Sequence, residues 1–354
     1  MVLSNPTHSK SPFLPLLLIA PFFFWGTAMV AMKGVIPHTT PLFIATMRLF
    51  PAGMLVIAVA RLMGRPQPQT WQAWAWITGF AVVDGAMFQG FLAEGLERTG
   101  AGIGSVMIDS QPIAVALMAR FLFGERIGLW GFLGLGFGVI GISLIGLPDT
   151  WIVDGYDALI HGQFAALLPD AGAIAHLNLT DLLTRLFQNG EWLMLLAALS
   201  MAVGTVMIRY VSKHADPVMA TGWHMLIGGV MVFVLSYNTE LLQYTFLRAG
   251  DWLALGYAAI FGGAIAYGLF FYFASSGNLT SLIALTFLTP VFALLFGYGF
   301  LGEVLSQLQA IGVILTLVSI YLINQRENLA ERFGNSAQTG DGQDLSVPGP
   351  AETD

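Results

Sequence analysis

The chain has 354 residues, of which 56% are hydrophobic and 10% are charged, and its formal net charge is −7. Soluble domains carry about 25% charged residues, so a water-soluble core of this length could not enclose so much apolar surface. The acidic balance argues against a nucleic-acid partner. The absence of cysteine excludes a disulfide framework, a thiolate nucleophile and a cysteine metal site. We therefore expect the lipid bilayer to be the solvent for most of the chain.

Mainly apolar runs of about 20 residues, the length of a membrane-spanning helix, occur ten times along the chain. The first run follows a short polar N-terminus and is too long for a cleaved signal peptide, so we expect it to be retained. The first five runs are Phe13–Met32, Leu42–Ala60, Ala73–Leu92, Ile103–Phe123 and Gly128–Leu147. The second five are Glu191–Tyr210, Val218–Ser236, Trp252–Ala274, Thr280–Gly299 and Leu305–Asn324.

Two polar segments lie outside these groups. Residues 148–190 contain five aspartates and one arginine, and the composition after about residue 326 cannot form a core. The expected organisation is a cytoplasmic N-terminus at 1–12, a five-helix repeat at 13–147, an external acidic connector at 148–190, a second five-helix repeat at 191–325 and a disordered cytoplasmic tail at 326–354.

The basic residues predict the orientation, because Lys and Arg collect in cytoplasmic loops. With both termini inside the cell, nine of the 14 basic residues fall in cytoplasmic segments and four fall outside. The remaining one, Arg48, lies within a span. This orientation puts the acidic connector outside.

The two groups of spans repeat each other at a constant offset along the chain. Gly26 matches Gly204, Pro112 matches Pro290, and Gly124-Glu125 matches Gly302-Glu303. Because each repeat holds an odd number of helices, the second copy must enter the membrane upside down, as in secondary transporters. The predicted fold class is an all-α membrane protein with ten transmembrane helices as two inverted five-helix repeats.

Glu125 and Glu303 fall in the tight turn between the fourth and fifth helix of each repeat. We expect a structural role, in which the carboxylate meets the unpaired N–H groups at a helix start and orders the hairpin. The alternative is contact with a proton or a substrate.

These residues also carry a resemblance to a known family. The stretches "FWGTAMVAMKGVIP" (24–37), "PLFIATMRLFPAGMLV" (41–56) and "TPVFALLFGYGFLGEVLSQLQAIGVILTLVSIYLI" (289–323), with Pro112 and Gly124-Glu125, are similar to the drug/metabolite transporter superfamily, specifically its EamA-type members. The resemblance implies a transporter, in particular an exporter of small metabolites, in a bacterial plasma (inner) membrane. The long acidic connector departs from the family's compact pattern, and so does His224 in the place of Arg48.

Ionisable side chains inside spans are costly and are therefore candidate functional residues. Arg48 and Asp84 lie near the middle of the second and third spans, where we expect them to pair; a purely structural bridge is the alternative. In the alignment of the two repeats, His224 corresponds to Arg48 and Gly262 corresponds to Asp84. Because glycine has no carboxylate, symmetry predicts no partner for His224. His224 is a candidate proton carrier, with a satisfied buried histidine as the alternative.

The third span continues with Gln89 and Glu94, which the repeat maps onto Tyr267 and Tyr272 in the eighth. A tyrosine supplies an apolar plate with a hydrogen-bonding end. We expect a central substrate-binding cavity between spans 2, 3, 7 and 8. Its residues are Arg48, Asp84, Gln89, Glu94, His224, Tyr267 and Tyr272.

The expected function is a secondary transporter that moves a small metabolite or amino-acid-like solute by alternating access, with Asp84 exchanging a proton. No HExxH, GxSxG, P-loop or GxGD pattern occurs, so we expect no catalysis, no cofactor and no metal site. The partners are then a small-molecule substrate and the lipid bilayer. A channel-like or facilitated-diffusion pore without proton coupling is the alternative, and an intramembrane enzyme is a more distant one.

Overall fold

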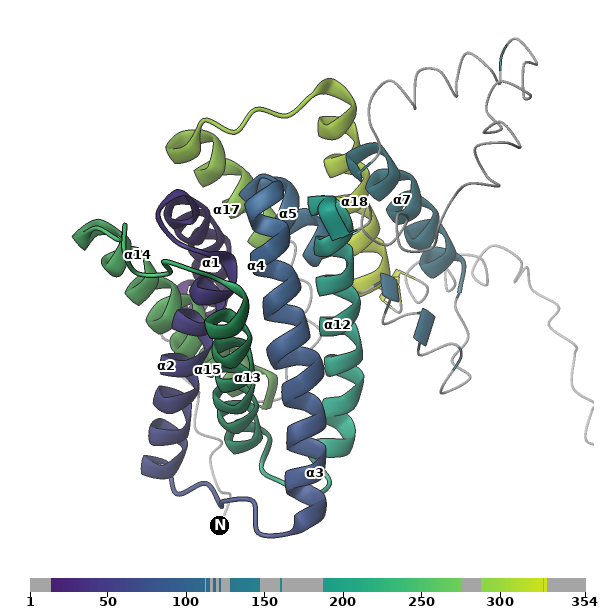
Figure 1. Ribbon diagram of the computed structural model, residues 1–354. Helices are drawn as coiled ribbons and strands as arrows, with labels where there is room; N and C mark the ends of the chain where they lie inside the picture. Colours follow the sequence, from purple (N-terminus) through teal and green to yellow (C-terminus); the bar gives the residue numbers. More distant parts are fainter. Residues whose placement is uncertain are drawn as a thin grey trace, which may run out of the picture.

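A computed structural model describes residues 14–111, 128–146, 187–275 and 288–326, with isolated positions at 113–114, 117–118, 121, 160 and 328–329. Secondary structure in these residues is entirely helical, which confirms the all-α class (Figure 1). The expectations for residues 1–12, for most of the acidic connector, for the tail and for Glu125 lie outside the described residues.

Among the described residues, helices fall within each of the ten ranges expected from the sequence, and six are long and apolar enough to cross a membrane. The first half holds α1 (Leu14–Val35), η1 (Ile36–His38), α2 (Pro41–Leu62), α3 (Trp71–Phe80), η2 (Ala81–Met87), α4 (Phe88–Arg98), α5 (Ala101–Ile108) and α7 (Leu129–Gly146). The second half holds α12 (Gly190–Val211), α13 (Pro217–Thr239), α14 (Ala249–Ala259), η3 (Ile260–Ile265), α15 (Ala266–Ser275), α17 (Leu288–Phe296), η4 (Gly297–Leu301) and α18 (Gln307–Asn324).

Local sequence signals account for where several helices begin. The side chains of Thr70, Asn189, Asp216 and Ser306 each accept a hydrogen bond from a backbone N–H in the first turn of the following helix. Such caps satisfy donors that have no partner within the helix. Proline opens both α2 and α13, where its missing N–H costs nothing.

The third and eighth spans each contain a π-helical segment, η2 and η3, in their interior. At the constant offset between the two halves, positions 82–87 of η2 fall on 260–265, which is the whole of η3. π-Helical turns are rare and concentrate at functional sites. The two halves therefore share a local irregularity as well as a sequence pattern, while the inverted orientation of the second half stays a prediction.

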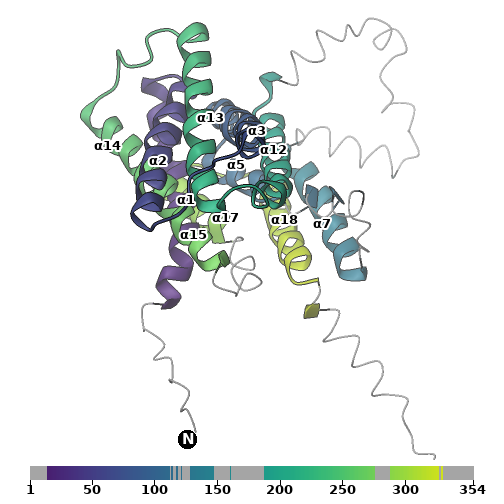
Figure 2. The same ribbon diagram turned by 90° about the horizontal axis from the view of Figure 1, so that it is seen from below.

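Glycines let two pairs of helices from opposite halves approach closely. The helices α2 and α13 pack along their length, and a Cβ atom added to Gly53 would lie 2.6 Å from the backbone nitrogen of Leu226. The helices α7 and α18 lie side by side in both views (Figures 1 and 2), where a Cβ on Gly312 would lie 2.7 Å from the carbonyl oxygen of Gly141. Small residues at such crossings are typical of helix packing in membranes.

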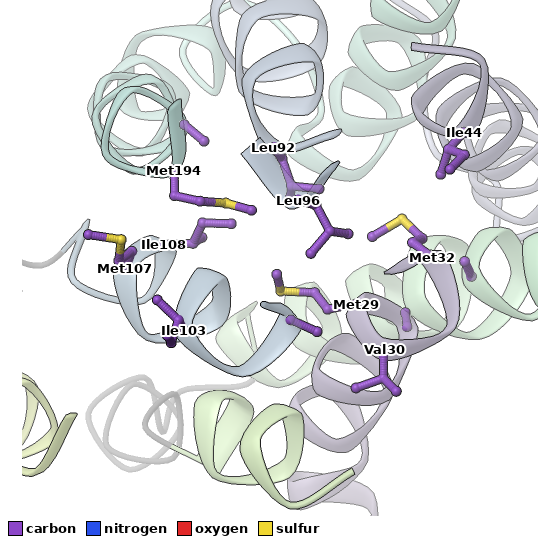
Figure 3. Packing of buried hydrophobic residues seen from close by; sticks show 14 of the residues in the cluster. Met29, Val30, Met32, Ile44, Leu92, Leu96, Ile103, Met107, Ile108 and Met194 are labelled. Atoms are coloured by element: carbon purple, nitrogen blue, oxygen red, sulfur yellow. The ribbon is translucent and has the colours of Figure 1, made fainter. Parts of the chain in front are cut away.

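The largest apolar cluster joins α1, α4, α5 and α12 and is rich in methionine (Figure 3). Met29, Met32, Met107 and Met194 are all at most 5% exposed. Methionine fills irregular gaps between helices because its side chain is flexible and polarizable. Large apolar side chains are also exposed on the outside of the bundle, for example Leu253, as expected of a surface in contact with lipid.

Candidate functional site

Four polar side chains are buried near the middle of the second, third and seventh spans. Their exposed fractions are 5% for Arg48, 8% for Asp84, 2% for Gln89 and 2% for His224. They come from α2, η2, α4 and α13, all elements within long apolar helices. Burial removes these groups from solvent, so each polar group needs a partner within the protein or on a ligand.

Asp84 pairs with His224. The carboxylate Oδ2 lies 3.1 Å from His224 Nε2, and the imidazole stacks on the ring of Phe80 with centroids 4.1 Å apart. Glycine makes room for the carboxylate, since a Cβ on Gly204 would lie 2.5 Å from Asp84 Oδ1. The second imidazole nitrogen, Nδ1, is buried and has no hydrogen-bond partner among the described residues.

Arg48 pairs with Gln89, whose side-chain oxygen accepts a hydrogen bond from Arg48 Nη1 at 3.1 Å. The sequence-based pairing of Arg48 with Asp84 is therefore wrong, and so is the expectation that His224 has no partner. The physical reason is local. Asp84 lies in the π-helical segment η2, which packs against α13, whereas Gln89 lies five residues on in α4, which packs against α2. Residues at this spacing occupy different helix faces.

Tyr267 joins the same region from the eighth span. Its side chain is partly buried, and its phenol lies within electrostatic range of both Arg48 and Asp84. Its ring packs edge-on against Trp25 of α1 at 5.3 Å, and Trp25 also contacts Phe22 and Phe270. We refer to Arg48, Asp84, Gln89, His224 and Tyr267 as the buried polar centre.

Glu94 lies apart from this centre. It forms an ion pair of 2.8 Å with Arg98, one turn further along α4. It also lines an open, mostly apolar groove of about 610 Å³ between α2, η2–α4 and α13. The structure thus brings together five of the seven expected site residues and separates Glu94 from them, while the side chain of Tyr272 lies outside what the structure describes.

Three further polar side chains were not predicted from the sequence. Two lie within three residues after the end of α5, and one lies in α17. Asp109 follows the last residue of α5 and accepts a hydrogen bond of 3.3 Å from Ser105 Oγ. Gln111 Oε1 and Thr289 Oγ1 are buried without a partner among the described residues. They occupy matching positions of the two repeats, each directly before one of the matched prolines. The rule that selected Arg48 and Asp84, an ionisable residue within an apolar span, would also have selected Asp109.

Glu303 caps a helix of the opposite half. Its two carboxylate oxygens accept hydrogen bonds from the backbone N–H groups of Ala101 and Gly102, at 2.6 and 3.0 Å. These groups open α5, whereas α18, the helix after Glu303, is capped by its own Ser306. The carboxylate does meet a helix start, but it ties the second half to the first instead of ordering its own hairpin.

The helices and the buried polar centre define a multi-pass helical membrane protein with polar side chains enclosed among its spans. The sequence pattern of the EamA-like transporter family matches residues 13–147 and 188–325. The chain therefore belongs to the EamA-like transporter family and is a membrane transporter. The resemblance and the multi-pass membrane location inferred from the sequence are confirmed.

Similar proteins agree with this assignment. A protein of Synechocystis sp. described as an uncharacterized transporter is 58% identical over 314 residues, covering 89% of this chain and 90% of its own. A WAT1-related chloroplastic protein of Arabidopsis thaliana is 50% identical over 315 residues, covering 87% of this chain and 68% of its own. A crystal structure with 17% identity and a TM-score of 0.57 covers 90% of this chain and 97% of that one, which shows a shared fold.

Proposed function

We propose that the protein is a secondary transporter that exports a small metabolite or amino-acid-like solute by alternating access. The observation that carries this proposal is the buried polar centre. Five polar side chains from both halves of the chain meet within long apolar helices of a protein that belongs to a transporter family. Polar groups in such a position are costly and mark a substrate or ion pathway in membrane proteins.

The arrangement of the halves supports a rocking motion around this centre. The matching π-helical segments η2 and η3 lie in the third and eighth spans, and η2 supplies Asp84. We propose that the second half is an inverted copy of the first, so that exchanging the conformations of the two halves opens the centre to one side and then to the other.

A proton site at Asp84 remains part of the proposal, with His224 as its partner in place of Arg48. One proton can be taken up or released by this pair, and either change alters the charge of the site by one unit. The carboxylate and the imidazole are 3.1 Å apart, so a proton bound by one group lies next to the other.

Reconstitution of the full chain in liposomes tests the transporter proposal. A carrier gives saturable flux and counterflow, in which an unlabelled solute on one side drives a labelled solute from the other. Substituting Gln89 or Tyr267 with Ala should lower this flux about tenfold while leaving membrane abundance near normal. Flux that stays linear with concentration and shows no counterflow would instead establish a pore.

A further inference from the structure

Arg48 is a permanent positive charge buried among apolar helices. A guanidinium stays protonated in proteins, and only 5% of this residue is exposed. Its hydrogen-bond partner is the neutral amide of Gln89. Among the described residues no carboxylate lies within 4 Å of it. A buried charge without a counter-ion is expensive, so this charge calls for an anion that the described part of the chain does not supply.

The carboxylates on the neighbouring elements already have partners. Asp84, in the third span, is held by His224 at 3.1 Å. Glu94, on the same helix as Gln89, is held by Arg98 at 2.8 Å. Another group within electrostatic range of Arg48 is Tyr267, whose phenol is a donor and acceptor of hydrogen bonds. Within the ranges that the structure describes, the guanidinium therefore has donors to offer and no carboxylate paired with it.

A second donor lies next to the same tyrosine. The indole Nε1 of Trp25 is buried and has no hydrogen-bond partner among the described residues, and the Trp25 ring packs against Tyr267. Phe22 and Phe270 add apolar rings to Trp25. The region thus combines a charged fork of N–H donors, an unpaired indole N–H, a phenol and an apolar wall.

We propose that Arg48 binds the carboxylate of the transported solute, which is a monoanionic group attached to an apolar body. A guanidinium matches a planar carboxylate with two parallel hydrogen bonds. A single arginine balances one negative charge, which favours a carboxylate over a doubly charged phosphate. Gln89 then positions the guanidinium. This assignment rests on the proposed transport function and names the substrate class of the same site.

The first test identifies the solutes. Cells that express the parent protein, the variant Arg48→Gln or no protein are compared by profiling small molecules inside and outside. We expect the solutes whose export depends on the protein to carry a carboxylate, and their export to fall about tenfold or more in Arg48→Gln. Protein-dependent export of neutral or cationic solutes would overturn the carboxylate assignment alone. If no solute depended on the protein, the transport function itself would fail, and this assignment with it.

The second test supplies Arg48 with an internal anion. Gln89→Glu places a carboxylate where the amide oxygen lies 3.1 Å from Nη1. If Arg48 binds the solute's carboxylate, the new glutamate competes with the solute for the guanidinium. Transport by Gln89→Glu of the solute found in the first test should then fall at least about tenfold in liposomes. The melting temperature should stay the same or rise, which separates competition from misfolding.

The matched control is Gln67→Glu, the same exchange in the turn before α3, where Gln67 contacts Trp223 and Met219 outside the buried polar centre. It should transport like the parent. A further comparison uses the amide of the same solute. The parent should transport the amide at least about tenfold more slowly than the acid, and Arg48→Gln should transport the amide as slowly as the parent does. A fully active Gln89→Glu, or equal transport of acid and amide by the parent, would show that Arg48 only bridges α2 and α4.

Discussion

The two ends of the helix bundle are held together by different chemistry. One end contains the turns at 36–41, 98–101, 239–249 and 302–306, and we call it the carboxylate end. Here side chains of the second half accept hydrogen bonds from the first. Glu240 accepts from the backbone N–H groups of Leu42 and Phe43 at the start of α2, and Glu303 does the same for α5. Asp251 contacts His38, and Glu191 accepts a hydrogen bond from the Thr99 hydroxyl.

The other end contains the turns at 63–70 and 211–217, where aromatic rings of the two halves are in contact, and we call it the aromatic end. Trp223 packs edge-on against Trp74, and Tyr210 stacks on Trp76 with ring centroids 5.4 Å apart. The ion pair at this aromatic end joins Arg65 to Asp216 at 3.4 Å, and the Arg65 side chain is 41% exposed.

This difference matters for a protein that must open and close. A carboxylate on the first N–H groups of a helix forms short, directional bonds that are lost together when the two parts separate. Contacts between aromatic rings are less directional, so the rings can shift against one another while staying in contact. If the halves rock as proposed, opening the carboxylate end requires Glu240 and Glu303 to release the N-termini of α2 and α5. We therefore expect a larger energy barrier for opening this end than for opening the aromatic end.

The largest expected effect is at Glu240. Glu240→Ala removes the acceptor of the Leu42 and Phe43 N–H groups and of the Thr40 and Ser236 hydroxyls. We expect the free energy of unfolding to fall by about 2 kcal/mol, because partly buried donors lose a charged acceptor. Thermal unfolding in detergent measures this. The control is Glu97→Ala, since the Glu97 side chain is 41% exposed; equal losses in the two variants would contradict the assigned role.

At Glu303 we expect a smaller loss. Glu303→Ala should lower the stability by about 1 to 2 kcal/mol, as for other lost helix caps. Glu303→Gln keeps one acceptor oxygen for the two N–H groups and should lie between Ala and the parent. The same variants should raise the rate of solute exchange in liposomes if release of this cap limits opening. Unchanged exchange with reduced stability would make Glu303 a purely structural tie.

At the aromatic end, Arg65→Ala should change the stability by less than about 0.5 kcal/mol, because exposed ion pairs contribute little. Trp223→Phe keeps most of the ring contact but loses the hydrogen bond of 2.9 Å that the Trp223 N–H donates to Gln67 Oε1. We expect a cost of about 1 kcal/mol, measured by the same unfolding assay. A cost for Arg65→Ala as large as that for Glu240→Ala would remove the contrast between the two ends.

Labelling shows which end faces outward without altering stability. The chain has no native cysteine, so single cysteines at Glu97 and Arg65, both 41% exposed, report one end each. We expect a membrane-impermeant maleimide to label the cysteine at position 97 in intact cells. The cysteine at position 65 should react only after the membrane is opened. The reverse pattern would invert the predicted topology.

Local sequence information was enough to predict the class of protein, the family and the ten ranges in which the described helices fall. These follow from local information: a helix that crosses lipid needs an unbroken apolar run, and proline and capping residues fix where it begins. The sequence also predicted Arg48, Asp84, Gln89 and His224 as candidate site residues, because any ionisable or strongly polar residue within such a run is conspicuous.

Which of these residues meet depends on how the helices pack. Asp84 pairs with His224 of the opposite half, and Glu303 caps α5, which also belongs to the half opposite its own. Repeat symmetry predicted neither contact. The pairing depends on the π-helical segment that sets the direction of Asp84 and on glycines that bring α13 and α12 close to it. Side-chain direction and the distance between helices are properties of the packed bundle, and a linear pattern of polar and apolar residues does not contain them.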